Sequence, residues 1–351
     1  MEITSGDVCL RTVWVAVEHS SHTAEVRRAA VELASSLNFS ETETGNVALV
    51  ATEATRNLLK HAGGGDVILR GGDGDGPPMV ELLALDKGPG IANISQSFQD
   101  GYSTAGTPGT GLGAISRVSS LHDIYSQPRQ GTALLVQISR HGSRAQERAA
   151  AAAPFQVGAV SVAMPGESVC GDSWAFSHLP RGGARLIIAD GLGHGLLASE
   201  AANEAARLAV ESPTEAGVTL LDRIHAALRP TRGAAVAVAD VDGGRLVLRY
   251  TGIGNISGSI VSPDGAVQHL VSHSGTVGHE VRKIAEFTYR FAPGCLLVMH
   301  SDGLASHWLL EKYPGLALRH PSLIAGILYR DFSRRRDDAT VVVLRHNGGA
   351  A

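Results

Sequence analysis

The chain has 351 residues, of which 44% are hydrophobic and 18% are charged, and its formal net charge is −4. This length favours two domains, the composition excludes extensive disorder, and the charge gives no general attraction to nucleic acid. The cysteines Cys9, Cys170 and Cys295 lie far apart, which argues against a disulfide framework or a zinc site and favours a cytoplasmic protein. We expect no signal peptide and no membrane association, because no basic-then-apolar segment begins the chain and no apolar run reaches about 20 residues.

Residues 1–140 are predicted to form one domain of the α+β class. Its expected strands lie at 8–18, 67–70, 79–86, 121–126 and 132–139, and its expected helices at 21–37, 40–61 and 112–120. Ser40 and Glu43 form an S-x-x-E pattern, which predicts a capping box at the start of the second helix. Residues 141–154, which consist largely of Ala, Arg, Gln and Glu, are interpreted as a linker. The alternative is that they form the last helix of the first domain.

Residues 155–351 are predicted to form a second domain that again mixes strands and helices. The expected strands lie at 157–163, 184–190, 234–241, 245–252, 295–302 and 339–345, and the expected helices near 196–211, 215–228 and 321–331. The sequence SPDG at 262–265 predicts the turn of a hairpin.

Two polar clusters in the first domain combine residue types that suit nucleotide chemistry. Glu53 and Asn57 are four residues apart in a predicted helix and therefore share one face. Their oxygens could orient a nucleophile and hold a hydrated Mg²⁺, although a solvated polar face would show the same spacing. Asp86 ends a predicted strand before Gly88 and Gly90. It could accept a hydrogen bond from an exocyclic amine, or be an ordinary turn aspartate.

The third cluster is GTPGTGLGA, whose glycines Gly106, Gly109, Gly111 and Gly113 lead into a predicted helix. Backbone N–H groups at a helix N-terminus form an anion site that suits phosphates. The segment has neither the βαβ setting of a dinucleotide fingerprint nor the GK[ST] ending of a P-loop.

Taken in order, E-x-x-x-N, D-x-G-x-G and G-T-G-L-G resemble the N, G1 and G2 boxes of the GHKL (Bergerat-fold) ATPase family. QDGYSTAGTPGTGLGA resembles more narrowly the anti-sigma and switch kinases of the RsbW/RsbT type. The resemblance covers about residues 8–140 and implies an ATP-binding α/β sandwich in which Glu53 is the base, Asn57 the Mg²⁺ ligand and Asp86 the adenine contact. It implies that the nucleotide is cradled by Gly88, Gly90, Gly109, Thr110, Gly111, Leu112 and Gly113. It also implies a lid at 99–109, with Lys60 and His61 in a supporting role.

Aspartates of the second domain fall into four separated clusters. They are CGDSW (Asp172), IIADGLGHG (Asp190), MHSDGL (Asp302) and RRRDDATVVV (Asp337, Asp338). Carboxylates collected at strand ends would make a hard oxygen site suited to Mg²⁺ or Mn²⁺. The alternative is a set of unrelated turn aspartates, because Asp-Gly is a common turn pair.

The order GD, ADGxGHG, SDG and DDAT resembles the SpoIIE/RsbX branch of the metal-dependent (PPM-type) serine/threonine phosphatases. This resemblance implies an αββα sandwich, and a water activated by two Mn²⁺ or Mg²⁺ ions, rather than a side chain, as the nucleophile. The implied metal ligands are Asp172, Asp190 as the bridge between the ions, the Gly191 carbonyl, Asp302 and Asp337. Asp338 would act beside them.

Three further positions near these motifs have two interpretations each or depart from the pattern. His194 could sit near the phosphate or serve the loop structurally. The run Arg334–Arg336 could attract a phosphoprotein or be a solvated charge run. Cys170 stands where relatives commonly have glycine.

The fused order predicts a regulator of partner switching, in the manner of stressosome or anti-sigma circuits. The N-terminal domain would use ATP·Mg²⁺ to phosphorylate a serine or threonine of a STAS-type antagonist protein, and the C-terminal domain would remove such phosphate. One alternative makes the N-terminal domain a nucleotide-gated binding module without phosphotransfer. A second makes the C-terminal domain a hydrolase of a small phosphate ester. A homodimer is possible.

Overall fold

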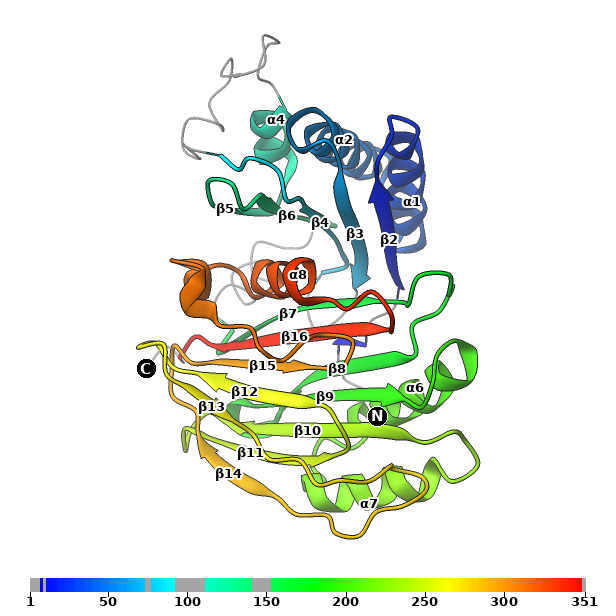
Figure 1. Ribbon diagram of the computed structural model, residues 1–351, viewed down its shortest axis with the longest axis vertical. Coiled ribbons are helices and arrows are strands. Elements are labelled where there is room, and N and C mark those ends of the chain that lie inside the picture. The colour runs from blue at the N-terminus through cyan, green and yellow to red at the C-terminus, as the bar shows by residue number, and fades with distance from the viewer. Residues whose placement is uncertain (1–6, 9–10, 73–76, 92–110, 141–152, 349–351) are drawn as a thin grey trace. The chain divides into compact units, whose positions relative to one another are not determined.

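The computed structural model describes residues 7–8, 11–72, 77–91, 111–140 and 153–348 (Figure 1). The chain divides into two compact units, one of Leu10–Glu147 and one that combines Met1–Cys9 with Arg148–Ala351. Gly106, Gly109, Thr110, the expected lid and residues 141–152 of the expected linker lie outside the described residues. In the part of the chain that is described, no helix has both the length and the hydrophobicity needed to cross a bilayer.

The N-terminal unit is one antiparallel sheet with its helices packed on one face. Its strand order is β2-β3-β4-β6-β5, with bounds β2 (Arg11–Val17), β3 (Gly65–Gly72), β4 (Met79–Leu85), β5 (Leu121–Ser126) and β6 (Thr132–Ser139). Its helices are α1 (His22–Ser36), α2 (Glu41–Asn57) and α4 (Gly111–Val118). The core includes Leu33, Ala51, Leu69 and Val136. The expected strands and helices of this unit are therefore confirmed, apart from the first residues of its first strand.

The predicted capping box starts α2. The Ser40 side chain accepts a hydrogen bond from the Glu43 backbone N–H at 3.3 Å, and the Glu43 carboxylate accepts one from the Ser40 backbone N–H at 2.7 Å. The other end of α2 continues as a π-helical turn, Leu58–Ala62. Such turns often lie at functional sites.

Two stacked sheets with helices on both outer faces form the C-terminal unit. One sheet has the order β1-β8-β9-β10-β11-β14 and the other β13-β12-β15-β16-β7. The first sheet contains β1 (Asp7–Val8), β8 (Asp172–Leu179), β9 (Gly183–Gly191), β10 (Ala234–Asp242), β11 (Val247–Ile253) and β14 (Phe287–Arg290). The second contains β7 (Phe155–Val162), β12 (Ser257–Val261), β13 (Val267–His269), β15 (Leu296–His300) and β16 (Ala339–His346).

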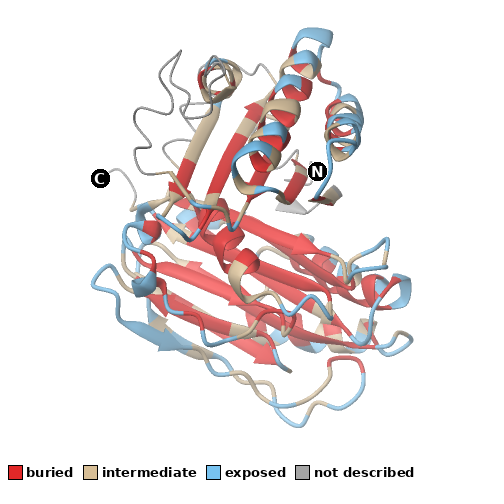
Figure 2. Cartoon of the chain, turned by 45° about the horizontal axis from the view of Figure 1, so that its top comes forward, coloured by how far each residue is buried: buried red, intermediate tan, exposed pale blue. Residues whose placement is uncertain are grey.

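Helices α6 (Leu196–Val210) and α7 (Gly217–Ala227) cover the first sheet, and α8 (Pro321–Phe332) covers the second. The layer between the sheets includes Trp174, Leu186, Tyr250, Leu297 and Val342, and Figure 2 shows both sheets as largely buried. The predicted αββα sandwich, the six strands and three helices that were expected in it, and the hairpin at 262–265 are confirmed.

Strand β1 corrects the expected boundary of the first domain. Asp7 and Val8 pair antiparallel with Phe176 and Ala175 of β8, so they belong to the sheet of the C-terminal unit. The expected strand at 8–18 is thus divided, and only Arg11–Val17 remains in the N-terminal sheet. The N-terminal unit is consequently flanked on both sides in sequence by parts of the C-terminal unit.

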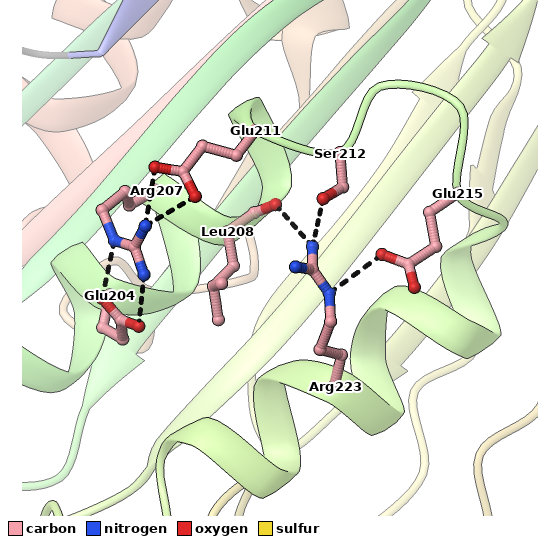
Figure 3. A network of polar contacts seen from close by, with 7 residues as sticks. All are labelled: Glu204, Arg207, Leu208, Glu211, Ser212, Glu215 and Arg223. Atoms are coloured by element: carbon pink, nitrogen blue, oxygen red, sulfur yellow. Dashed lines mark hydrogen bonds and ion pairs between the residues drawn. The ribbon is translucent and has the colours of Figure 1, made fainter.

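A buried ion pair fastens the connection between α6 and α7. Arg185 on β9 is only 2% exposed and lies opposite Asp240 on β10. Its Nε donates to Asp240 Oδ1 at 2.6 Å, and its Nη2 donates to Asp240 Oδ2 at 2.8 Å. Its Nη1 donates to the Ser212 carbonyl at 2.8 Å. Figure 3 shows the neighbouring network, in which Arg223 contacts Ser212 and Glu215.

Replacing Arg185 by leucine is expected to lower the free energy of unfolding by about 3–5 kcal/mol, because Asp240 would remain buried and charged without its partner. The control is Arg207→Leu, since Arg207 bridges Glu204 and Glu211 in a solvent-exposed position (Figure 3) and such pairs contribute less than about 1 kcal/mol. Urea denaturation of the full chain measures both. Equal losses in the free energy of unfolding would show that the buried Arg185 pair contributes no more to stability than the exposed one.

Candidate functional site

Five aspartates come together at one edge of the C-terminal unit. Asp172 begins β8 and lies directly opposite Asp190 near the end of β9. Because β15 and β16 are antiparallel, the end of β15 before Asp302 lies beside the start of β16 after Asp337 and Asp338. The Ser301 hydroxyl joins the two sheets here by donating to Asp172 Oδ2 at 2.7 Å.

Protein donors hold three of the other carboxylates in place. Asn255 Nδ2 donates to Asp302 Oδ2 at 2.8 Å, the Met164 backbone N–H donates to Asp338 Oδ1 at 2.8 Å, and the Asp338 backbone N–H donates to Asp337 Oδ1 at 2.9 Å. The second oxygen of Asp338 is buried and has no hydrogen-bond partner among the residues that the structure describes. A buried carboxylate oxygen without a partner is costly and calls for a ligand.

Glycine is required next to this oxygen. A Cβ on Gly171 would lie 2.5 Å from Asp338 Oδ2, so no larger residue fits between Cys170 and Asp172 without displacing the carboxylate. The departure at Cys170 does not disturb this approach, because the glycine that precedes Asp172 is retained.

Burial and mutual repulsion make this edge hold protons. Burial, followed by the charges of Asp172, Asp302, Asp337 and Asp338, raises the pKa of Asp190 to about 9. Burial is also the main cause that raises the pKa of Asp172 to about 7, with a hydrogen bond from Ser301 opposing it. The pKa of Asp302 is raised by burial and by Asp337, while the Arg334 charge and the Asn255 hydrogen bond lower it. All five aspartates therefore share one electrostatic environment.

This donor set fits hard divalent cations. Carboxylate and carbonyl oxygens are the ligands that Mg²⁺ and Mn²⁺ prefer. A bound cation would give the buried Asp338 oxygen a partner and would offset the repulsion between the carboxylates. As they stand, no three His, Cys, Asp or Glu side chains of the described chain are placed to hold a metal ion together.

Metal binding is expected to remove the pH dependence of stability that the raised pKa of Asp190 produces. In the metal-free protein the folded state binds more protons than the unfolded state between the ordinary pKa of 3.8 and about 9, so its free energy of unfolding falls as the pH rises through this window. Saturating Mn²⁺ balances the carboxylates and should flatten the slope, and its uptake should release protons. Urea denaturation at several pH values, with and without Mn²⁺, measures this. Identical slopes would contradict it.

Two loops beside the aspartates hold further polar groups. His194, four residues after Asp190, has its Nδ1 2.6 Å from Glu167 Oε1. The Arg334 backbone N–H donates to the Gly303 carbonyl at 2.9 Å, which places the start of the arginine run beside Asp302. Sequence reasoning missed Asn255, Ser301 and Glu167. Ser301 could have been noticed in the HSDG motif, whereas the others carry no local signal.

The polar clusters of the N-terminal unit also meet. A Cβ on Gly111, the first residue of α4, would lie 3.1 Å from Glu53 Oε2 and 3.6 Å from Asn57 Oδ1 on α2. The E-x-x-x-N helix therefore adjoins the start of the G-L-G helix, in which Leu112 and Gly113 follow. The Glu53 carboxylate also forms an ion pair with Arg56 at 3.1 Å.

Asp86 anchors the loop that carries Gly88 and Gly90. Its Oδ1 accepts hydrogen bonds from the backbone N–H groups of Gly88 at 2.8 Å and Thr132 at 3.1 Å. A Cβ on Gly131, which has φ +82°, would lie 1.9 Å from the Asp86 carbonyl oxygen, so this close approach requires glycine. Burial and the Lys60 charge lower the pKa of His61, while the charge of Asp86 opposes them, which links the end of the α2 region to this loop.

The αββα sandwich with its aspartate edge has the architecture of a PPM-type serine/threonine phosphatase domain. The α/β unit, in which the polar residues of α2 lie near the start of α4, has that of a GHKL-type ATPase domain. Comparison with known families agrees. Residues 180–347 match the family Stage II sporulation protein E (SpoIIE), and residues 17–138 match the histidine kinase-like ATPase domain. The chain thus joins a histidine kinase-like ATPase domain to a SpoIIE-type phosphatase domain, as the sequence motifs predict.

Individual relatives show the same two halves. The chain is 27% identical over 139 residues to the Phosphoserine phosphatase RsbX of Bacillus subtilis (40% of this chain, 69% of the relative). It is 29% identical over 100 residues to the Serine/threonine-protein kinase RsbT of the same organism (28% of this chain, 75% of the relative). A solved chain from work on the bacterial stressosome as a modular system has a TM-score of 0.51 and 27% identity, covering 54% of this chain and 99% of that one.

Proposed function

We propose that this chain is a bifunctional partner-switching regulator that acts on a STAS-type antagonist protein in the cytoplasm. The C-terminal domain would remove phosphate from phosphoserine or phosphothreonine, and the N-terminal domain would transfer phosphate from ATP to serine or threonine. The observation that carries the proposal is the meeting of five aspartates from four separate segments at one sheet edge. Relatives named as a phosphatase and a kinase, one for each half, support it.

In the phosphatase domain, Asp172, Asp190, Asp302, Asp337 and the Gly191 carbonyl would hold two Mn²⁺ or Mg²⁺ ions. When bound, such ions supply an activated water and offset the charge of the phosphoryl group. Ser301 and Asn255 position Asp172 and Asp302 through their hydrogen bonds.

Cysteine chemistry is disfavoured at this edge. Burial, together with the charges of Asp172 and Asp338, raises the pKa of the Cys170 thiol well above 9. In the metal-free protein the thiol therefore stays protonated at neutral pH, which disfavours it as a nucleophile. Attack by water remains the route that the aspartate edge supports.

In the ATPase domain, Glu53 would accept the proton of the substrate hydroxyl, Asn57 would bind Mg²⁺ and Asp86 would contact adenine. The proximity of Glu53 and Asn57 on α2 to the start of α4 supports this assignment. Gly88, Gly90, Gly111, Leu112 and Gly113 would cradle the nucleotide, together with Gly109 and Thr110 outside the described residues.

One observation favours the alternative of a nucleotide-gated binding module. The Glu53 carboxylate is ion-paired with Arg56, and this contact competes with proton acceptance. If the pair persists when ATP binds, the domain would sequester a partner without phosphorylating it.

Two assays on the full chain test the proposal. A phosphorylated STAS-domain protein should lose phosphate in the presence of Mn²⁺, and the unphosphorylated protein should gain label from γ-labelled ATP in a single turnover. Tight ATP binding without label on the STAS-domain protein would favour the binding module. Manganese-dependent hydrolysis of small esters alone would favour a small-molecule phosphatase.

A further inference from the structure

An apolar patch lies beside the aspartate edge. It consists of large hydrophobic side chains that stay exposed in the described chain: Val169 (37% exposed), Leu192 (46%), Leu196 (64%) and Leu197 (49%). We call these four residues the apolar rim. Single exposed leucines are common on protein surfaces, but several together mark a surface that binds something.

The two segments that carry the rim pack against each other. His194 contacts Glu167 at 2.6 Å, and a Cβ on Gly195 would lie 3.0 Å from the Glu167 carboxylate. A Cβ on Gly171 would lie 3.0 Å from the Cβ of Ala198. The segment that contains Val169 therefore lies against the start of α6, which carries Leu196 and Leu197.

The rim residues lie close to two of the aspartates along the chain. Val169 precedes Asp172 by three residues, and Leu192 follows Asp190 by two.

A cation accompanies the apolar residues. Arg232 places its Nη1 3.1 Å from where a Cβ on Gly193 would lie, within the loop that carries Leu192. The Arg232 side chain is exposed. An exposed guanidinium next to leucines complements a phosphate group on an apolar protein surface.

We propose that the apolar rim and Arg232 form the docking surface for a folded phosphoprotein whose phosphorylated serine or threonine is surrounded by apolar side chains. The proposal rests on the phosphatase function proposed above. A small phosphate ester would leave the rim in water, whereas a folded protein removes it from water on binding. The rim is small beside a stable interface, which suits an enzyme that must release its product.

The test compares the double variant Leu196→Ser/Leu197→Ser with Leu318→Ser in the full chain. Serine is well tolerated where a helix begins, so α6 should be retained. Leu318 is 83% exposed, so it is a matched control for the loss of an exposed leucine. Its carbonyl accepts a hydrogen bond from Arg345, which lies near the end of β16 that is far from Asp338. The substrates are a STAS-domain protein phosphorylated on serine and p-nitrophenyl phosphate, both with Mn²⁺.

The ratio of kcat/KM for the phosphoprotein to that for p-nitrophenyl phosphate should fall at least about tenfold in the double variant and stay constant in Leu318→Ser. Arg232→Gln, which leaves α6 intact, should raise KM for the phosphoprotein. If the ratio is unchanged in the double variant and in Arg232→Gln, the proposed docking surface is wrong. A wild-type chain that cleaves neither substrate overturns the phosphatase function instead. A change of oligomeric state in the double variant, seen by sedimentation velocity, would assign the rim to self-association and also overturn the proposal.

Discussion

Asp190→Asn is expected to lower manganese-dependent phosphate release by at least about a thousandfold, which corresponds to about 4 kcal/mol of transition-state stabilisation. Asp190 is the carboxylate whose pKa is raised by all four other aspartates of the edge, so it lies near each of them. The amide keeps the shape of the side chain but removes the charge that would attract divalent cations. Release from a phosphorylated STAS-domain protein and from p-nitrophenyl phosphate measures the effect, and calorimetry with Mn²⁺ measures the accompanying loss of affinity.

The matched control for this loss is Asp242→Asn. Asp242 ends β10 opposite Val247, whereas Asp190 pairs with Ala235 at the other end of the same strand. The same chemical change far from the aspartate edge should leave phosphate release within about twofold. Asp302→Asn should behave like Asp190→Asn. If both edge variants release phosphate at the wild-type rate, the phosphatase assignment of these residues is wrong.

Glu53→Gln is expected to reduce phosphate transfer from ATP at least about a hundredfold while nucleotide affinity changes little. A positioned general base contributes about 10²–10⁴ in rate, and glutamine cannot accept the proton. The side chain lies against Gly111 at the start of α4, and the amide has the size to keep that packing. Single-turnover assays with labelled ATP, together with a nucleotide-binding measurement, separate the two effects.

Glu41→Gln is the control for this experiment, because Glu41 is an exposed residue in the first turn of the same helix. Phosphate release by the C-terminal domain should be the same in both variants. Transfer that persists at full rate in Glu53→Gln would exclude Glu53 as the base. A Glu53→Ala variant that behaves like the wild type in every nucleotide assay would exclude any role in the ATP site.

Local patterns were enough to predict most of the fold. The S-x-x-E sequence located the start of α2, and apolar periodicity located its neighbours. Strand β8 was missed because Ser173 and Ser177 interrupt its apolar residues, although both are buried. Strand β14 has only four residues at a sheet edge. Strand β1 depends on pairing with residues nearly 170 positions away, which no local pattern reveals.

The residues of the candidate site that could be predicted from the sequence are those that follow directly on a strand. Asp190 and Asp302 each follow an apolar strand and precede glycine, so they were visible one at a time. Their supporting groups were not visible. Asn255 reaches Asp302 across 47 residues and Ser301 reaches Asp172 across 129. Such contacts are created by the register of the sheets, which the sequence of one chain does not display.

Strand β1 makes the ATPase domain an insertion rather than an attachment. The polypeptide leaves the first phosphatase sheet after Val8, builds the entire ATPase domain and re-enters the phosphatase domain at β7. The inserted domain is therefore joined covalently to the phosphatase domain at both of its ends. A truncated chain that starts at residue 155 would also lose β1 and leave that stretch of β8 open to pairing with a foreign strand. Separating the two domains between residues 141 and 154 would thus alter the phosphatase domain as well.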